Sequence, residues 1–190
     1  RSDRTILAQL ISGAGSLTSA QGSVALAGAN TYSGGTTITG GIIGAYHNTA
    51  LGTGTLTIGG ASLLVGRSVT TLANAITLGG NVALGHATYY GPLTLSGTLN
   101  LGGAAHTMTV DSAINLTGVI SNGGFTKAGA GTLTISSSAA NTYAGATTIT
   151  AGMIATGGSA GRLGSTSGVA LSSGATLQLN TSETINLLTG

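Results

Sequence analysis

The sequence predicts an all-β fold, a right-handed parallel β-helix of about nine or ten coils that spans residues 1–190 as a single segment. Three observations lead to this prediction. The composition is rich in glycine and almost free of charge. Short segments alternate threonine with apolar residues. One long motif occurs twice along the chain, which is typical of repeat architectures.

The composition excludes several classes of protein. Only 4% of the 190 residues are charged, against roughly 25% in an ordinary globular protein, so threonine, serine, asparagine and backbone must form the solvated surface. Hydrophobic residues make up 41% of the chain, so it is not disordered by composition. Cysteine is absent, which removes disulfides and thiolate metal sites. The few cations are scattered along the chain, and we therefore expect no nucleic-acid partner.

A motif at residues 30–43 recurs at residues 141–154, where ten of the fourteen positions are identical. The match extends in both directions, with small changes of length between its conserved points. We therefore divide the chain into a repeat unit at about residues 9–118 and a partial second unit at about residues 119–190.

The local pattern within each unit is that of short strands. Threonine alternates with apolar residues at 36–39, 55–58, 93–95, 108–110 and 132–135, and this period of two indicates half-buried strands. Glycine pairs separate these segments. Residues 4–11 would also suit a helical turn or two, but the equivalent residues 114–120 have the pattern of a strand, and both segments are therefore predicted to be strands.

These strands are shorter than those of a β-sandwich, which favours a solenoid. A coil of about 20 residues, stacked at the strand spacing of roughly 4.8 Å, would place five to six coils in each repeat period. Threonines in successive coils would then stand one above another, and such cross-strand pairs stabilise a sheet.

Residues 17–43, 125–135 and 141–152 resemble the passenger-associated transport repeat, also called the autotransporter-associated β-strand repeat. This resemblance implies a β-helical passenger that crosses an outer-membrane translocator barrel and is displayed at the bacterial cell surface or released outside the cell. It also implies roles in adhesion and self-association. Ser19 stands where Lys127 lies in the second copy, so the fold does not require that lysine. We expect the chain to be a segment of a larger protein.

The residues suited to catalysis are few and far apart in sequence. Polysaccharide-cleaving enzymes use paired carboxylates, but Asp3, Asp111 and Glu183 are expected on different coils. His86 and His106 are about one coil apart and are expected to stack on neighbouring coils, yet two imidazoles alone make a poor metal site. We therefore predict no catalytic residues, no cofactor and no metal.

Two sets of residues remain as candidate sites. The first set occupies three equivalent positions in the two copies and is predicted to be structural: Asn30, Tyr32, Gly34, Asn141, Tyr143 and Gly145. The second comprises tyrosines outside the shared motif, which suit contact with a host or matrix glycan or protein: Tyr46, Tyr89 and Tyr90.

Three functions stay open at this stage. The first is a non-enzymatic stalk or adhesin that self-associates, end to end or laterally. The second is a subunit of an extracellular filament, because residues 6–11 and 185–188 are apolar and do not resemble polar caps. The third, a tailspike-like enzyme that cleaves polysaccharide, is least favoured for want of acids.

Overall fold

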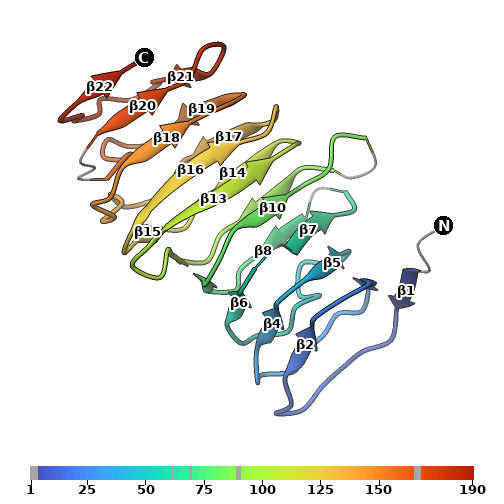
Figure 1. Cartoon of the computed structure of the whole chain (residues 1–190). Coiled ribbons are helices and arrows are strands. Elements are labelled where there is room, and N and C mark those ends of the chain that lie inside the picture. The colour runs from blue at the N-terminus through green and yellow to red at the C-terminus, as the bar shows by residue number, and fades with distance from the viewer. Residues whose placement is uncertain (1–3, 61, 69, 89–90, 165–167) are drawn as a thin grey trace.

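The computed structural model describes residues 4–60, 62–68, 70–88, 91–164 and 168–190, and these form a β-solenoid (Figure 1). Every regular element in the described chain is a strand, and all strand pairs are parallel. None of the described residues forms a helix long and apolar enough to cross a membrane. The predicted fold class is confirmed.

The strands stack into three sheets, named here A, B and C. Sheet A contains, in order, β1 (Arg4–Leu7), β3 (Ser23–Leu26), β5 (Gly41–Ala45), β7 (Ser62–Gly66), β10 (Val82–Leu84), β13 (Ala105–Val110), β16 (Gly124–Ala128), β18 (Thr147–Ile149), β20 (Val169–Leu171) and β22 (Leu188–Thr189). Sheet B contains β2 (Leu17–Ser19), β4 (Thr36–Ile38), β6 (Leu56–Ile58), β9 (Ile76–Leu78), β12 (Leu99–Asn100) and β15 (Ile120–Ser121). Sheet C contains β8 (Thr70–Leu72), β11 (Leu93–Leu95), β14 (Ile114–Leu116), β17 (Thr132–Ile135), β19 (Met153–Thr156) and β21 (Thr176–Gln178).

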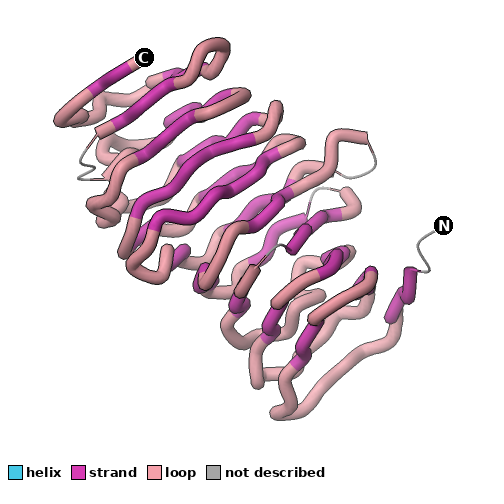
Figure 2. The backbone as a smooth tube through the Cα atoms, in the orientation of Figure 1, coloured by secondary structure: helices cyan, strands magenta, loops and turns pink. Residues whose placement is uncertain are grey.

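The chain visits the sheets in the order B, A, C on each winding, so that strands of one sheet lie one coil apart. The ten strands of sheet A are joined by nine windings, with loops in place of some strands of the other two sheets (Figure 2). The predicted strand at 114–120 is in fact two strands, β14 in sheet C and β15 in sheet B, because the chain turns a corner between them.

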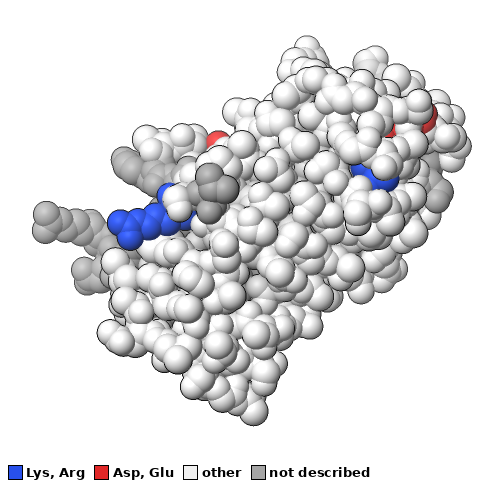
Figure 3. Space-filling view, turned by 180° about the vertical axis from the view of Figure 1, so that it is seen from behind, with Lys and Arg blue, Asp and Glu red and all other residues white. Residues whose placement is uncertain are grey.

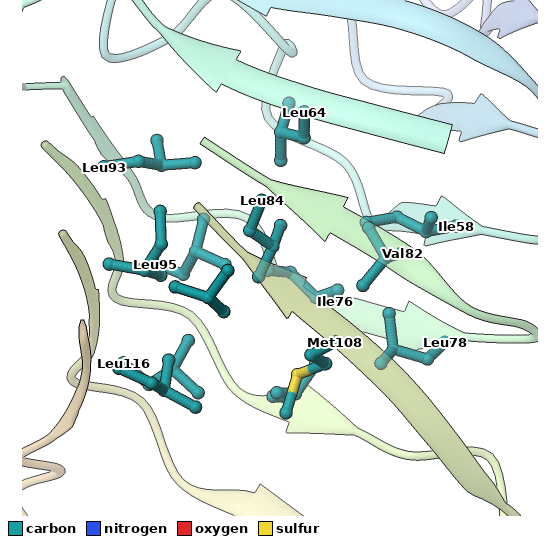
Figure 4. Packing of buried hydrophobic residues seen from close by; sticks show 14 of the residues in the cluster. Ile58, Leu64, Ile76, Leu78, Val82, Leu84, Leu93, Leu95, Met108 and Leu116 are labelled. Carbon is teal, nitrogen blue, oxygen red and sulfur yellow. The ribbon is translucent and has the colours of Figure 1, made fainter. Parts of the chain in front are cut away.

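Short strands with apolar ends explain the narrow interior. In β6, β9 and β11 the first and last residues are buried and the central threonine is partly exposed. The side chains of Leu64, Leu84, Leu95 and other aliphatic residues fill the space between the sheets (Figure 4). Parallel pairing sets the central residues in register, and Thr37, Thr57 and Thr77 therefore form a ladder on the outer face of sheet B.

The two copies of the repeat motif use different faces of the solenoid. In the first copy β2 pairs with β4 in sheet B, with Leu17 beside Thr36. In the second copy the equivalent strands β16 and β18 pair in sheet A, with Phe125 beside Thr147. From the first copy to the second the chain makes five full windings and then advances by one sheet, from B to A. The second copy is therefore turned about the solenoid axis by one of its three faces relative to the first.

Candidate functional site

The asparagine of each repeat copy bonds three successive coils together. Asn30 is fully buried; its Oδ1 accepts a hydrogen bond from the backbone N of Ile11 (2.8 Å), and its Nδ2 donates to the carbonyl of Ala50 (2.7 Å). Asn141 accepts from the backbone N of Ile120 (2.8 Å) and donates to the carbonyl of Arg162 (2.5 Å). Each asparagine satisfies buried backbone groups on the coils before and after its own, where an unpaired group would be costly.

The repeat tyrosines lie in the interior beside these asparagines. Tyr32 and Tyr143 are 2% and 0% exposed. Each hydroxyl is hydrogen-bonded to a threonine four residues later, Tyr32 to Thr36 at 2.5 Å and Tyr143 to Thr147 at 2.9 Å. The rings of Tyr143 and Phe125 also pack in a T-shaped arrangement, with 5.5 Å between their centroids. Their packing is therefore that of core residues with a satisfied polar end.

A glycine stands two residues after each tyrosine because adjacent coils come into backbone contact there. A Cβ atom on Gly34 would lie 2.6 Å from the carbonyl oxygen of Ala14, and one on Gly145 would lie 2.6 Å from that of Gly123. Real Cβ atoms do not approach backbone so closely. The asparagines and glycines of the repeat motif therefore lie where one coil meets the next, and its tyrosines pack in the interior beside them.

Burial of the tyrosines predicts alkaline unfolding. Desolvation raises the pKa of Tyr143 and of Tyr32 above the usual 10.0, in each case opposed by the threonine hydrogen bond. The unfolded chain loses these protons near pH 10 while the folded chain keeps them, so the free energy of unfolding should fall as the pH rises above 10. Tyr143→Phe should weaken this dependence, as measured by urea unfolding between pH 9 and 11. An unchanged pH slope would contradict the assignment.

Lys127, the single lysine of the chain, is fully buried in the second repeat copy. Its position on β16 is register-equivalent to Ser19 on β2, because the two residues pair with Ile149 and Ile38. The Nζ atom donates to the carbonyls of Ala128 (3.0 Å), Gly129 (2.7 Å) and Ala151 (2.9 Å), which come from two coils. The ammonium thus closes a turn from inside, with backbone oxygens in place of a carboxylate.

Arg162 is a second buried cation in the same copy, with 1% of its surface exposed. Its Nη1 donates to the carbonyls of Ser137 and Ala139 and to the Ser137 hydroxyl, and its Nη2 donates to the carbonyl of Ala160. Lys127 and Arg162 were not predicted as interior residues, because charged side chains are seldom fully buried.

The buried lysine predicts a rise in stability with pH, opposite in sign to the tyrosine effect. Burial lowers the pKa of Lys127 below 10.5, partly offset by the nearby Asp111. Between the lowered pKa and 10.5 the unfolded chain binds more protons, so the free energy of unfolding should increase with pH across that window. Lys127→Met should remove this increase in chemical-denaturation curves measured from pH 8 to 10. Persistence of the slope in the variant would assign it to another group.

The described acids and histidines do not converge. Asp111 follows β13, whereas Glu183 lies between β21 and β22 and accepts hydrogen bonds from Leu163 N and the Thr181 hydroxyl; Asp3 lies outside the described residues. No group of three metal-ligating side chains occurs in the described ranges. The expected stacking of His86 on His106 is wrong, because Val82 pairs with Met108 and the register places His86 beside residue 112.

Of the three candidate contact tyrosines, Tyr46 is partly exposed in the loop after β5, and the Arg67 guanidinium carbon lies 5.4 Å from its ring centroid. Tyr89 and Tyr90 lie outside the described residues. A separate hollow of about 430 Å³ lies on the outer face of sheet A, lined by Ile42, Leu63 and Ala83 among others. On the face of the molecule shown in Figure 3, charged side chains occupy two small areas and the remaining surface is uncharged.

Comparison with protein families finds the passenger-associated-transport-repeat at residues 21–43 and 125–155. The first match covers β3, β4 and the start of β5, and the second covers most of β16, all of β17 and β18, and most of β19. Both matches include the loop that carries the repeat asparagine and tyrosine, called here the asparagine–tyrosine loop. No curated protein and no solved structure matches the chain. The repeat family and the solenoid fit a segment of an autotransporter passenger, which is a secreted or surface-exposed class of protein. The chain thus has two segments that match the passenger-associated-transport-repeat, turned by one face relative to each other on a parallel β-solenoid.

Proposed function

We propose that this chain is a non-enzymatic structural segment of a passenger at the bacterial cell surface, where it acts as a stalk with adhesive and self-associating surfaces. The observation that carries this proposal is the inward direction of the repeat motif. Asn30, Tyr32, Asn141 and Tyr143 are all buried. The two asparagines bond one coil to the next, and each tyrosine hydroxyl bonds a threonine on its own coil. The polar groups of the motif are used to hold the coils of the solenoid together, which supports a structural role as a stalk.

The separation of the described carboxylates supports the non-enzymatic part of the proposal. The carboxylates of Asp111 and Glu183 are separated by the coils of β16, β18 and β20. General acid–base cleavage of a polysaccharide needs two carboxylates within about 10 Å. A tailspike-like activity therefore has no support among the described residues.

The scarcity of charge supports self-association. Outer-face ladders such as Thr37, Thr57 and Thr77 carry no charge, so little electrostatic repulsion opposes lateral contact between rods. Purified chain should show concentration-dependent association by sedimentation. A monomer at all concentrations would remove this part of the proposal.

The stalk role is tested in bacteria that make the parent protein. An antibody against the segment should label intact cells, and deletion of residues 1–190 should shorten the surface rod by about 40 Å, nine coil steps, in electron micrographs. Labelling only after cell lysis, or an unchanged rod length, would contradict it. Loss of cell adhesion with unchanged display would assign the adhesive surface to this segment.

A second candidate function is a filament subunit that stacks end to end. Its support is the exposure of large apolar side chains on the two terminal coils, with Ile6 at 58%, Leu10 at 61%, Leu187 at 59% and Leu188 at 60%. A further coil, from the same chain or from another copy, would cover them. Electron microscopy of the isolated chain should distinguish single short rods from filaments with an axial repeat near one segment length.

A further inference from the structure

The outer face of sheet B carries one continuous column of short polar side chains. Parallel pairing sets one outward residue of each strand beside that of the next strand. The members of this column, called here the sheet B column, are Thr18, Thr37, Thr57, Thr77, Asn100 and Ser121. Neighbouring members are separated by the strand spacing of about 4.8 Å, so the column extends over roughly 24 Å along the rod.

The four threonines of the sheet B column keep their hydroxyl groups available to solvent. They are exposed or half-buried, and their side chains form no hydrogen bond within the described part of the chain. Other threonines nearby are used internally, since the Thr36 hydroxyl donates to the carbonyl of Leu51 and the Thr39 hydroxyl donates to that of Ser19. The column hydroxyls can therefore bond to external water without breaking a bond inside the protein.

The strands beneath the column fix the positions of these hydroxyls. Thr37, Thr57 and Thr77 each lie between two buried residues, and each of their strands is paired with a neighbour on both sides. The β-branched side chain of threonine also has few rotamers. The column is therefore a nearly rigid row of hydroxyl and methyl groups with one period, the coil spacing.

The surface on both sides of the column is low and uncharged. Gly59 and Gly79 stand two residues after Thr57 and Thr77, and small residues also stand two residues before them. Charged and aromatic residues are both absent from the stretches that form this face, which are 16–20, 35–39, 55–59, 75–79, 98–102 and 119–123. No ring is present on which a sugar could stack, and no bulky group separates the column from a flat solid surface.

We propose that the sheet B column binds the surface of ice through water molecules that its hydroxyls hold in a row. Bridging water of this kind is enthalpically nearly as favourable as a direct hydrogen bond. The column period of about 4.8 Å is close to the repeat of oxygen atoms along the a axis of hexagonal ice, so the row can continue into the crystal lattice. This inference goes beyond the stalk function and does not depend on it.

The test is inhibition of ice recrystallisation by the purified chain, measured as mean grain size in annealed frozen sucrose solution, with serum albumin at equal concentration as the reference. The chain should keep the grains small. Thr57→Lys should raise the lowest effective concentration at least tenfold, because a long charged side chain interrupts the row. Thr57→Val should raise it several-fold, because valine keeps the shape of threonine and loses the hydroxyl.

Thr134→Lys provides the matched control and should leave the effective concentration unchanged. Thr134 is also half-buried between two buried residues of a strand, but it lies on β17 in sheet C. Its neighbour on the preceding coil is Asn115, whose Nδ2 donates to the Thr94 hydroxyl. The threonines of sheet C are therefore interrupted. Circular dichroism confirms that each variant retains the fold.

Three results would overturn the proposal. Grains as large as those with serum albumin would show that the chain does not bind ice. Equal losses in Thr57→Lys and Thr134→Lys would assign the effect to surface charge in general, and full activity of Thr57→Val would exclude the hydroxyl row as its cause. Surface display and rod length are measured independently on cells, so each of these failures leaves the stalk function standing.

Discussion

Asn141→Ala is expected to lower the free energy of unfolding by about 3 kcal/mol, since buried backbone groups that lose a partner each cost roughly 1–3 kcal/mol. The substitution removes the acceptor for Ile120 N and the donor to the Arg162 carbonyl, on two different coils. It also removes the acceptor for the Ser137 hydroxyl at 3.0 Å, and Ser137 itself contacts Arg162. Urea unfolding followed by circular dichroism measures the change.

Asn81→Ala provides the matched control. The Oδ1 atom of Asn81 also accepts a backbone N–H from a neighbouring coil, that of Thr107 at 2.8 Å, but this bond is exposed to solvent. Water replaces an exposed partner, so the control should lose less than about 1 kcal/mol. Equal losses in both variants would show that burial of the asparagine contributes nothing, against the role assigned to the repeat motif.

Gly118→Ala is expected to have a comparable effect through sterics. A Cβ atom at this position would collide with the carbonyl oxygen of Gly97, on the preceding coil. Backbone cannot rotate away as a side chain does, so the two coils must separate locally. Forced overpacking of this kind typically costs about 1–3 kcal/mol or more, and we expect the upper end, measured as a fall in melting temperature and in urea midpoint.

The control for this prediction is Gly79→Ala. Gly79 is also a turn glycine within the stack, but its Cβ would meet Gly59 Cα at an ordinary 3.7 Å, and its backbone needs no positive φ. Loss of backbone entropy in the unfolded chain should make this variant neutral or slightly more stable. A Gly118 variant as stable as the Gly79 variant would mean that the coils do not approach each other as closely as described.

The features predicted from sequence are those that depend on local period and on repetition. Alternation at 36–39 and 132–135 places β4 and β17 correctly, because a period of two has only one structural meaning. Recurrence of residues 30–43 at 141–154 indicates a stack of similar coils. The equivalence of Ser19 and Lys127 is also recovered, since aligned motifs pair with the same register in the two copies.

The features that the sequence did not predict depend on where the chain turns from one sheet to the next. His86 and His106 are separated by one coil length, yet the winding between β10 and β13 is longer than average and shifts the register. The burial of Lys127 was not predicted, because the sequence shows the charged side chain but not the backbone carbonyls that surround it in the fold. One signal was present: three residues separate Lys127 from Gly131, where two separate Ser19 from the equivalent Gly22, and this extra residue provides the longer turn that the ammonium fills.

The one-face offset between the two motif copies has a geometric consequence for any longer array with the same spacing. Each further copy would point in a new direction, and a fourth would again face the same way as the first. The asparagine–tyrosine loops would then follow a helical path around the rod instead of a straight line along it. Loops of this kind would be reachable from every side of such a rod.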